Sequence, residues 1–148
     1  MNEARQQFWR ELNERIRERE DTPLRAMERA DAENDNWRKQ PTMASSLGVG
    51  FNVRLDGQML VYLIPRDREK REEMFDFLRD FKSEIDAEFD GRLEWRPPDQ
   101  STKIIVRRKD VDIGSNRARW SEYQNWLIEN GEQFFTVFRP YARRYGSH

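Results

Sequence analysis

The sequence contains no cysteine and a single histidine, which is the last residue, His148. Without cysteine the protein has no disulfide, no catalytic thiolate and no sulfur-ligated zinc or iron–sulfur site. A lone terminal histidine excludes a serine–histidine–aspartate triad and a histidine-ligated metal centre. The absence of cysteine also fits a reducing compartment, and we expect a cytoplasmic protein.

Long apolar runs are missing as well. No stretch approaches the roughly 20 apolar residues that a membrane-spanning helix needs. The N-terminal sequence MNEARQQFWRELNER lacks the apolar segment of a signal peptide. The net charge of only −1 at pH 7 provides no overall field that attracts nucleic acid or membrane. We therefore expect no membrane partner, and nucleic-acid binding would require a local patch.

Charge is distributed unevenly along the chain. Residues 66–91 contain six basic and ten acidic residues, whereas residues 92–119 contain eight basic and four acidic residues. An acidic segment therefore precedes a basic one, and the second segment is the place to look for an anion-binding surface.

Length and composition favour one folded domain covering residues 1–148. A chain of this size hides roughly 68–70% of its unfolded surface, which is enough for a real core. Although 37% of the residues are charged and only 36% are apolar, 12% are aromatic. Large rings bury about 150–250 Å² each, so a core can be built from few residues.

The N-terminal third of the chain predicts helices and a loop. An apolar stripe at helical spacing indicates a helix in residues 1–19, with the members Phe8, Trp9, Leu12 and Ile16. Residues 20–47 predict a short helix and then a polar loop, in which Trp37 is the aromatic anchor. A connection of this length often carries function.

Residues 48–145 predict the core of the domain, in which a hairpin–helix unit occurs twice. Asp56-Gly57 is a strong signal for a two-residue type I′ turn, which gives paired positions whose numbers sum to 113, such as Val53 and Leu60. The return strand MLVYLI is apolar at every position, which indicates an interior strand covered on both faces. We interpret the small residues of GVGFNV as the place where the outgoing strand crosses a packed helix.

A helix is predicted after each hairpin. The first runs from a cap at Asp67 to Gly91, and the second from near residue 115 to a stop at Arg139-Pro140. The segment RLEWRPPDQSTKIIVRR between them forms the second hairpin. The fold class is therefore α+β: a four-stranded, mainly antiparallel sheet from two β-hairpins, each followed by a long helix, plus an N-terminal helix. One sheet face cannot use all these helices, so we expect the first helix to cover the face holding Met59, Val61 and Leu63.

No catalytic motif is present, and no glycine-rich phosphate loop of standard spacing occurs. We therefore expect a protein that is not an enzyme and needs no cofactor. The carboxylates Asp86, Glu88 and Asp90 near the end of the third predicted helix are an alternative, the metal site of a small hydrolase. A solvated helix surface is the simpler interpretation of the same three residues.

The most informative polar residues are basic. If Leu93 and Trp95 face the core, the alternate residues of the second hairpin share the opposite face. Such a face would neutralise phosphates while an aromatic side chain stacks on a base. The predicted nucleic-acid-binding residues are Arg92, Arg96, Lys103, Arg107, Arg108, Lys109 and Trp37. The alternatives are a solvated face and ion pairing with the preceding acidic helix. The tail FRPYARRY is either a docking segment or a solvated terminus.

Several hydrophobic and aromatic landmarks occur in a familiar order: FWRELNERI, Asn36-Trp37, LGVGFNVRL, MLVYLI, MFDFLRDFKSEIDAEFDGRLEW and YQNWLIENGEQFFTVFRPY. Over about residues 6–141 the chain resembles an uncharacterised prokaryotic family of domains of unknown function. Members of that family are commonly found C-terminal to nuclease domains of the PD-(D/E)XK, restriction-endonuclease-like, type. The resemblance implies a fold and a nuclease-associated setting, and it transfers no catalytic residue.

These observations favour a stand-alone, non-catalytic binding module that binds nucleic acid and works beside a nuclease or DNA-processing protein. The alternative is a protein–protein interaction or homo-oligomerisation module without nucleic-acid binding. A metal-dependent hydrolase using Asp86 to Asp90 is the third possibility. Neither the ligand nor the oligomeric state follows from the sequence.

Overall fold

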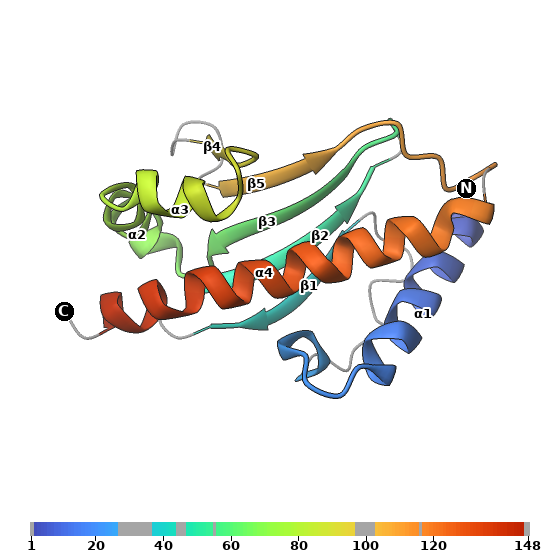
Figure 1. The fold of residues 1–148 in the computed structure, drawn as a ribbon, viewed down its shortest axis with the longest axis horizontal. Helices are drawn as coiled ribbons and strands as arrows, with labels where there is room; N and C mark the ends of the chain where they lie inside the picture. Colours follow the sequence, from blue (N-terminus) through green and yellow to red (C-terminus); the bar gives the residue numbers. More distant parts are fainter. Residues whose placement is uncertain are drawn as a thin grey trace.

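The computed structural model describes residues 2–26, 37–43, 47–54, 56–96, 103–115 and 117–146. Its helices, strands and 3-10 turns follow one another along the chain as shown in Figure 1. They are α1 (Asn2–Glu18), η1 (Pro23–Ala26), β1 (Trp37–Thr42), β2 (Leu47–Val53), β3 (Met59–Pro65), η3 (Arg68–Lys70), α2 (Arg71–Arg79), α3 (Lys82–Glu88), β4 (Glu94–Arg96), β5 (Lys103–Arg108), η5 (Arg117–Arg119) and α4 (Trp120–Gly146). No helix in this described part of the chain has the length and apolar character needed to cross a membrane.

The strands form one antiparallel sheet in the order β1-β2-β3-β5-β4. The predicted α+β class, with two hairpins and an N-terminal helix, is confirmed. The apolar strand β3 lies between β2 and β5, as expected of an interior strand. The described helices pack on only one of its faces, whereas the sequence predicted cover on both. The sheet also contains β1, which the sequence analysis placed in a loop. Its residues WRKQPT show no apolar alternation. The strand therefore depends on hydrogen bonding to the edge of β2, which the sequence pattern does not reveal.

The pairing of β2 with β3 differs from the prediction by one residue. Val53 pairs with Met59 rather than with Leu60, and the Arg54 N–H donates to the Gln58 carbonyl over 2.8 Å. Gly57 has a φ of +85°, as in a three-residue hairpin loop that ends in the left-handed conformation. Leu55, which the two-residue turn would have paired, lies outside the described residues.

The corrected register places the alternating apolar residues of β2 and their partners on β3 on one side of the sheet, because directly paired residues share a face. We call this side the core face; its members in β2 and β3 are Val49, Phe51, Val53, Met59, Val61 and Leu63. All six are buried, together with the stripe of α1 formed by Phe8, Trp9, Leu12 and Ile16. The stripe of α1 is therefore buried in one cluster with Met59, Val61 and Leu63, as predicted. The expectation that α1 covers a face of its own is wrong, because α4 lies on the same side of the sheet (Figure 1).

The helix after the first hairpin is divided into α2 and α3. As predicted, the Asp67 side chain caps the segment by accepting from the Glu69 N–H over 3.1 Å. The division falls at Asp80 and Phe81, where the Phe81 N–H bonds to the Leu78 carbonyl in a tight turn. No proline or glycine causes it. Instead, Phe77 and Phe81 pack against the rings of Tyr145 and Tyr141 at the end of α4. We attribute the break between α2 and α3 to these tertiary contacts.

The predicted stop of the last helix at Arg139-Pro140 is wrong, because α4 continues to Gly146. A proline inside a helix costs about 3 kcal/mol. The turns beyond it are held by ring contacts of 5.2 Å between Tyr141 and Phe81 and between Tyr145 and Phe77. The predicted tail is therefore largely a packed helical end whose aromatic residues join α4 to the α2–α3 segment.

Candidate nucleic-acid interface

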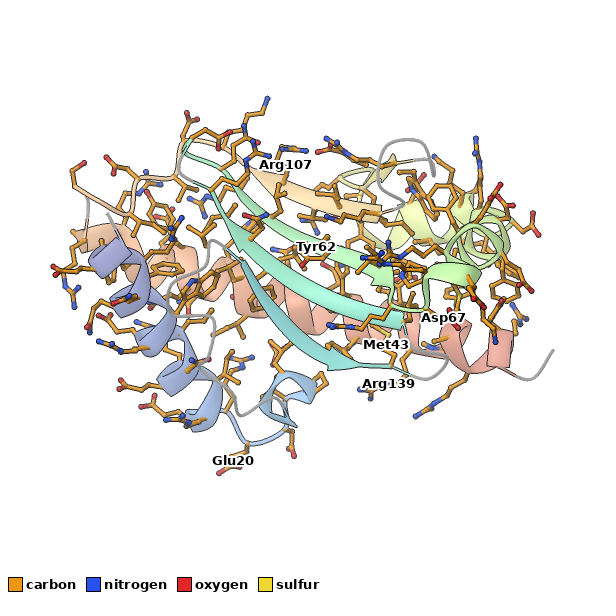
Figure 2. All side chains as sticks on the ribbon, turned by 180° about the vertical axis from the view of Figure 1, so that it is seen from behind. Glu20, Met43, Tyr62, Asp67, Arg107 and Arg139 are labelled. Atoms are coloured by element: carbon orange, nitrogen blue, oxygen red, sulfur yellow. The ribbon has the colours of Figure 1, made fainter. Side chains whose placement is uncertain are left out.

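The side of the sheet opposite the core face is turned away from α4. Figure 2 shows Tyr62 and Arg107 on this side, which no described helix crosses. We call it the outer face; from the register its members in β2 to β5 are Gly48, Gly50, Asn52, Leu60, Tyr62, Ile64, Glu94, Arg96, Lys103, Ile105 and Arg107. Leu60, Tyr62 and Ile105 form a small apolar cluster separate from the main core.

Two glycines of β2 allow side chains to lie directly on the outer face. A Cβ added at Gly50 would stand 2.2 Å from Tyr62 Cζ, and one added at Gly48 would stand 2.2 Å from Arg66 Nε. Arg66 also donates from Nη2 to the Val49 carbonyl over 3.4 Å. The glycines of GVGFNV therefore make room for Tyr62 and Arg66, not for a crossing helix as the sequence analysis proposed.

A row of cations crosses one end of this face. Arg96 and Lys103 are direct partners on β4 and β5, and continuing the register places Lys103 beside Ile64, which pairs with Gly48. The Arg66 guanidinium lies over that glycine. We call Arg96, Lys103 and Arg66 the basic row. With strands about 4.7–4.9 Å apart, its positions extend over roughly 14 Å.

The cations of the basic row are partly buried and influence one another. The Lys103 ammonium lies over the Tyr62 ring, 4.8 Å from its centroid. Burial lowers the pKa of Lys103, and the neighbouring Arg71 and Arg96 lower it further. Burial also lowers the pKa of Arg66, an effect that Tyr62 opposes. Like charges thus lie close together here, which favours binding of an anion.

Arg107, the next predicted residue, lies on the outer face but its charge is balanced. Its Nε and Nη2 donate to the two carboxylate oxygens of Glu94 over 2.8 and 3.2 Å, and Nη1 donates to Gln58. The hydrogen bond from Arg107 is the main reason that the pKa of Glu94 is lowered. Arg96 approaches the same carboxylate only to 3.8 Å. The single negative charge of Glu94 is therefore shared between two arginines.

Arg92 does not lie on the outer face, contrary to the prediction, because β4 begins only at Glu94. Its guanidinium donates to the Phe89 carbonyl over 3.1 Å and to Asn130 Oδ1 over 2.9 Å. It also donates to Gln133 over 3.1 Å. Because Asn130 and Gln133 belong to α4, Arg92 ties the start of the second hairpin to that helix.

The remaining predicted residues are scattered. Arg108 pairs with Met59 of the core face and forms an ion pair with Glu122 at the start of α4. Lys109 follows β5 and is exposed. The backbone of Trp37 pairs with Asn52, which is an outer-face position on β2, while the side chain of Trp37 lies outside the described residues. The structure thus brings together Arg96, Lys103 and Arg107 from the predicted set.

Of the three carboxylates considered as a metal site, Asp86 is engaged in other contacts. Asp86 accepts from Trp95 Nε1 over 2.8 Å and from Lys82 Nζ over 2.7 Å. Within the ranges that the structure describes, no group of three histidine, cysteine or acidic residues is placed to hold a metal ion.

Arg66, Arg71 and Tyr62 belong to this surface or adjoin it, and the sequence pattern did not predict them there. A signal existed, because a three-residue turn places Gly50 opposite Tyr62, and a cross-strand aromatic residue often covers a strand glycine. Arg71 donates from Nε to the Pro65 carbonyl over 2.8 Å, which holds the start of α2 next to the end of β3.

Residues 4–142 match the family described as Domain of unknown function (DUF4268), and the chain belongs to that family. Comparison with curated proteins and with solved structures gives no match.

Proposed function

We propose that this member of the DUF4268 family is a non-catalytic nucleic-acid-binding module. We further propose that it acts in the cytoplasm beside a nuclease or DNA-processing protein. The observation that carries the proposal is the basic row on a sheet face that no described helix crosses. On this face the cations Arg66, Arg96, Lys103 and Arg107 accompany one described carboxylate, Glu94.

The excess positive charge suits a phosphate backbone. In the described part of the chain, Lys103 forms no ion pair, and its neighbours Arg71 and Arg96 are cations. Each phosphate neutralised by a basic side chain releases counterions, so affinity falls with salt. Three contacts from the basic row imply a drop in affinity of about 40-fold for a four-fold rise in salt concentration.

The test is binding of single- and double-stranded DNA at about 50 and 200 mM salt. We expect the double variant Arg96→Glu with Lys103→Glu to abolish measurable binding at the lower salt concentration. The matched control is Arg17→Glu on the exposed side of α1, which makes the same kind of charge change away from the sheet. No binding by the unmodified protein at low salt, or equal losses in both variants, would refute the proposal.

A second candidate is self-association or docking of another protein. The observation that favours it is the apolar cluster of Leu60, Tyr62 and Ile105 on the outer face, with Ile64 packed against it. Light scattering coupled to size-exclusion chromatography separates the candidates. A stable dimer whose mass does not change with salt supports association through this cluster, whereas a monomer leaves the face available for nucleic acid.

A further inference from the structure

We infer that the outer face recognises the phosphate backbone of nucleic acid without stacking on bases, and that Tyr62 is a positioning residue for the basic row. This inference rests on the proposed function and specifies which part of the nucleic acid is bound. It differs from the sequence analysis, which assigned base stacking to an aromatic side chain beside the basic hairpin.

The Tyr62 ring is not available to a base. Its hydroxyl end lies against the backbone of Gly50, where a Cβ would stand 2.3 Å from the Tyr62 oxygen. The Lys103 ammonium covers the ring at 4.8 Å from the centroid. Only 8% of the residue is exposed. Stacking needs an open ring face, and the surroundings of Tyr62 leave none.

Tyr62 is also the sole aromatic residue among the described outer-face positions of β2 to β5. The other ring in the second hairpin, Trp95, pairs with Ile104 on the core face, and its Nε1 is bound by Asp86. The remaining outer-face side chains are aliphatic, amide or charged. Over the described positions of β2 to β5, this surface therefore presents cations beside aliphatic groups.

The arrangement around Tyr62 holds the cations in place. The ring attracts the Lys103 ammonium electrostatically, as aromatic faces attract cations. The Tyr62 hydroxyl and the Arg66 guanidinium lie on the alternate glycines Gly50 and Gly48 of β2, on the same face of the sheet. Tyr62 therefore joins two members of the basic row across the sheet.

The length of the row matches a backbone contact. Its roughly 14 Å compares with one phosphate per about 3.4 Å of axis along each strand of duplex DNA. The row can therefore follow several consecutive phosphates of one strand. Contacts to phosphate fix the position of a protein on nucleic acid but carry no sequence information.

The experiment compares an oligothymidylate with an abasic phosphodiester oligomer of the same length, which has the phosphates but no bases. We expect the two dissociation constants to agree within about two-fold, with equal salt slopes. A loss of ten-fold or more with the abasic oligomer would overturn the inference while leaving the proposed function intact. If neither oligomer binds, the proposed function itself fails. The same comparison tests stacking by Trp37.

Two variants of Tyr62 separate positioning from stacking. Tyr62→Phe keeps the ring under Lys103, so both oligomers should bind within about two-fold of the unmodified protein. Tyr62→Leu removes the ring, and affinity for the two oligomers should fall by the same factor. A fall confined to the oligothymidylate would show that Tyr62 stacks on bases and would overturn the inference.

Lys103→Met provides an independent test should Tyr62→Leu fail to fold. This variant removes one cation and leaves an apolar side chain near the ring. If the row binds phosphates alone, affinity falls equally for both oligomers. If the ring is a stacking platform that Lys103 blocks, the oligothymidylate gains affinity relative to the abasic oligomer, which would contradict the inference.

Discussion

On each face of the β2–β3 hairpin an aromatic ring lies directly against a glycine, but the surroundings of the two rings differ. On the core face, the Phe51 ring lies so close to Gly131 of α4 that a Cβ there would stand 2.8 Å from it. On the outer face, Tyr62 lies as closely on Gly50. Phe51 is enclosed by apolar side chains, whereas Tyr62 is covered by a lysine and lies beside an arginine.

The difference lies in what surrounds each ring. Phe51 belongs to a cluster that includes residues of all four helices and is 0% exposed. In the part of the chain that the structure describes, the small cluster of Leu60, Tyr62 and Ile105 has Ile64 as its one further apolar neighbour. A glycine opposite an aromatic residue therefore produces a core where helices close over the ring, and a platform for charged groups where they do not.

The largest effect is expected from Phe51→Ala. A buried phenylalanine changed to alanine costs about 3–5 kcal/mol of unfolding free energy, and this ring has helices around it that cannot close the gap fully. Urea denaturation measures the loss. The matched variant Tyr62→Ala on the outer face should cost clearly less, and equal losses would remove the distinction between the faces.

Gly131→Ala comes next. Alanine gains about 1 kcal/mol in helix propensity over glycine, but its Cβ would meet the Phe51 ring at 2.8 Å. Overpacking of a closed core costs about 1–3 kcal/mol, so we expect a net loss of about 1 kcal/mol. A rise in the midpoint of urea denaturation would show that Phe51 can move and that the core face is looser than described.

Gly50→Ala should destabilise less in spite of the closer approach of 2.2 Å. The Tyr62 ring can swing away from the sheet because no described helix lies over it, and we expect a cost below about 1 kcal/mol. Displacing Tyr62 also displaces Lys103. Fluorescence anisotropy should therefore show weaker DNA binding by Gly50→Ala and unchanged binding by Gly131→Ala.

Glu94→Gln has the smallest expected effect on stability. The pKa of Glu94 is lowered in the folded protein, chiefly by Arg107. Its contribution is therefore complete above the unfolded pKa of about 4.3 and is lost as pH falls through the lowered folded pKa. The difference in urea denaturation between Glu94→Gln and the unmodified protein should shrink from pH 6 to pH 3.

Glu94→Gln also tests whether DNA binding depends on the charge of the outer face. Removing the only described carboxylate of the outer face leaves the charge of Arg107 unbalanced, so DNA binding should strengthen by about three-fold at low salt. The control Asp86→Asn removes a carboxylate that is bound to Trp95 and Lys82, and should leave affinity unchanged. Weaker binding by Glu94→Gln would contradict the proposed role of the outer face.

The features predicted correctly have local causes. The stripe Phe8, Trp9, Leu12 and Ile16 repeats at helical spacing, and the structure buries all four residues. The uniformly apolar MLVYLI lies inside the sheet as β3. Apolar patterning indicates which residues of an element become buried, and it does so without knowledge of what buries them.

The features predicted wrongly depend on distant parts of the chain. The polar strand β1 forms because β2 presents an unpaired edge, and α4 passes Pro140 because its last rings pack on Phe77 and Phe81. In the candidate site, too, the wrong prediction concerns a residue whose contacts come from a distant part of the chain. Alternation correctly placed Arg96, Lys103 and Arg107 together, but it could not show that Arg92 is bound by α4.

By itself the sequence determines an α+β domain, its amphipathic α1 and α4, its interior strand and the basic character of its second hairpin, since periodicity and composition are local properties. The tertiary structure alone decides that no described helix crosses the outer face of the sheet, and that Arg66 and Tyr62 lie there beside Lys103. The physical reason is the hairpin register: one residue in the turn determines which side chains share a face, and the register formed here buries Phe51 with α4 while Tyr62 lies on the opposite face.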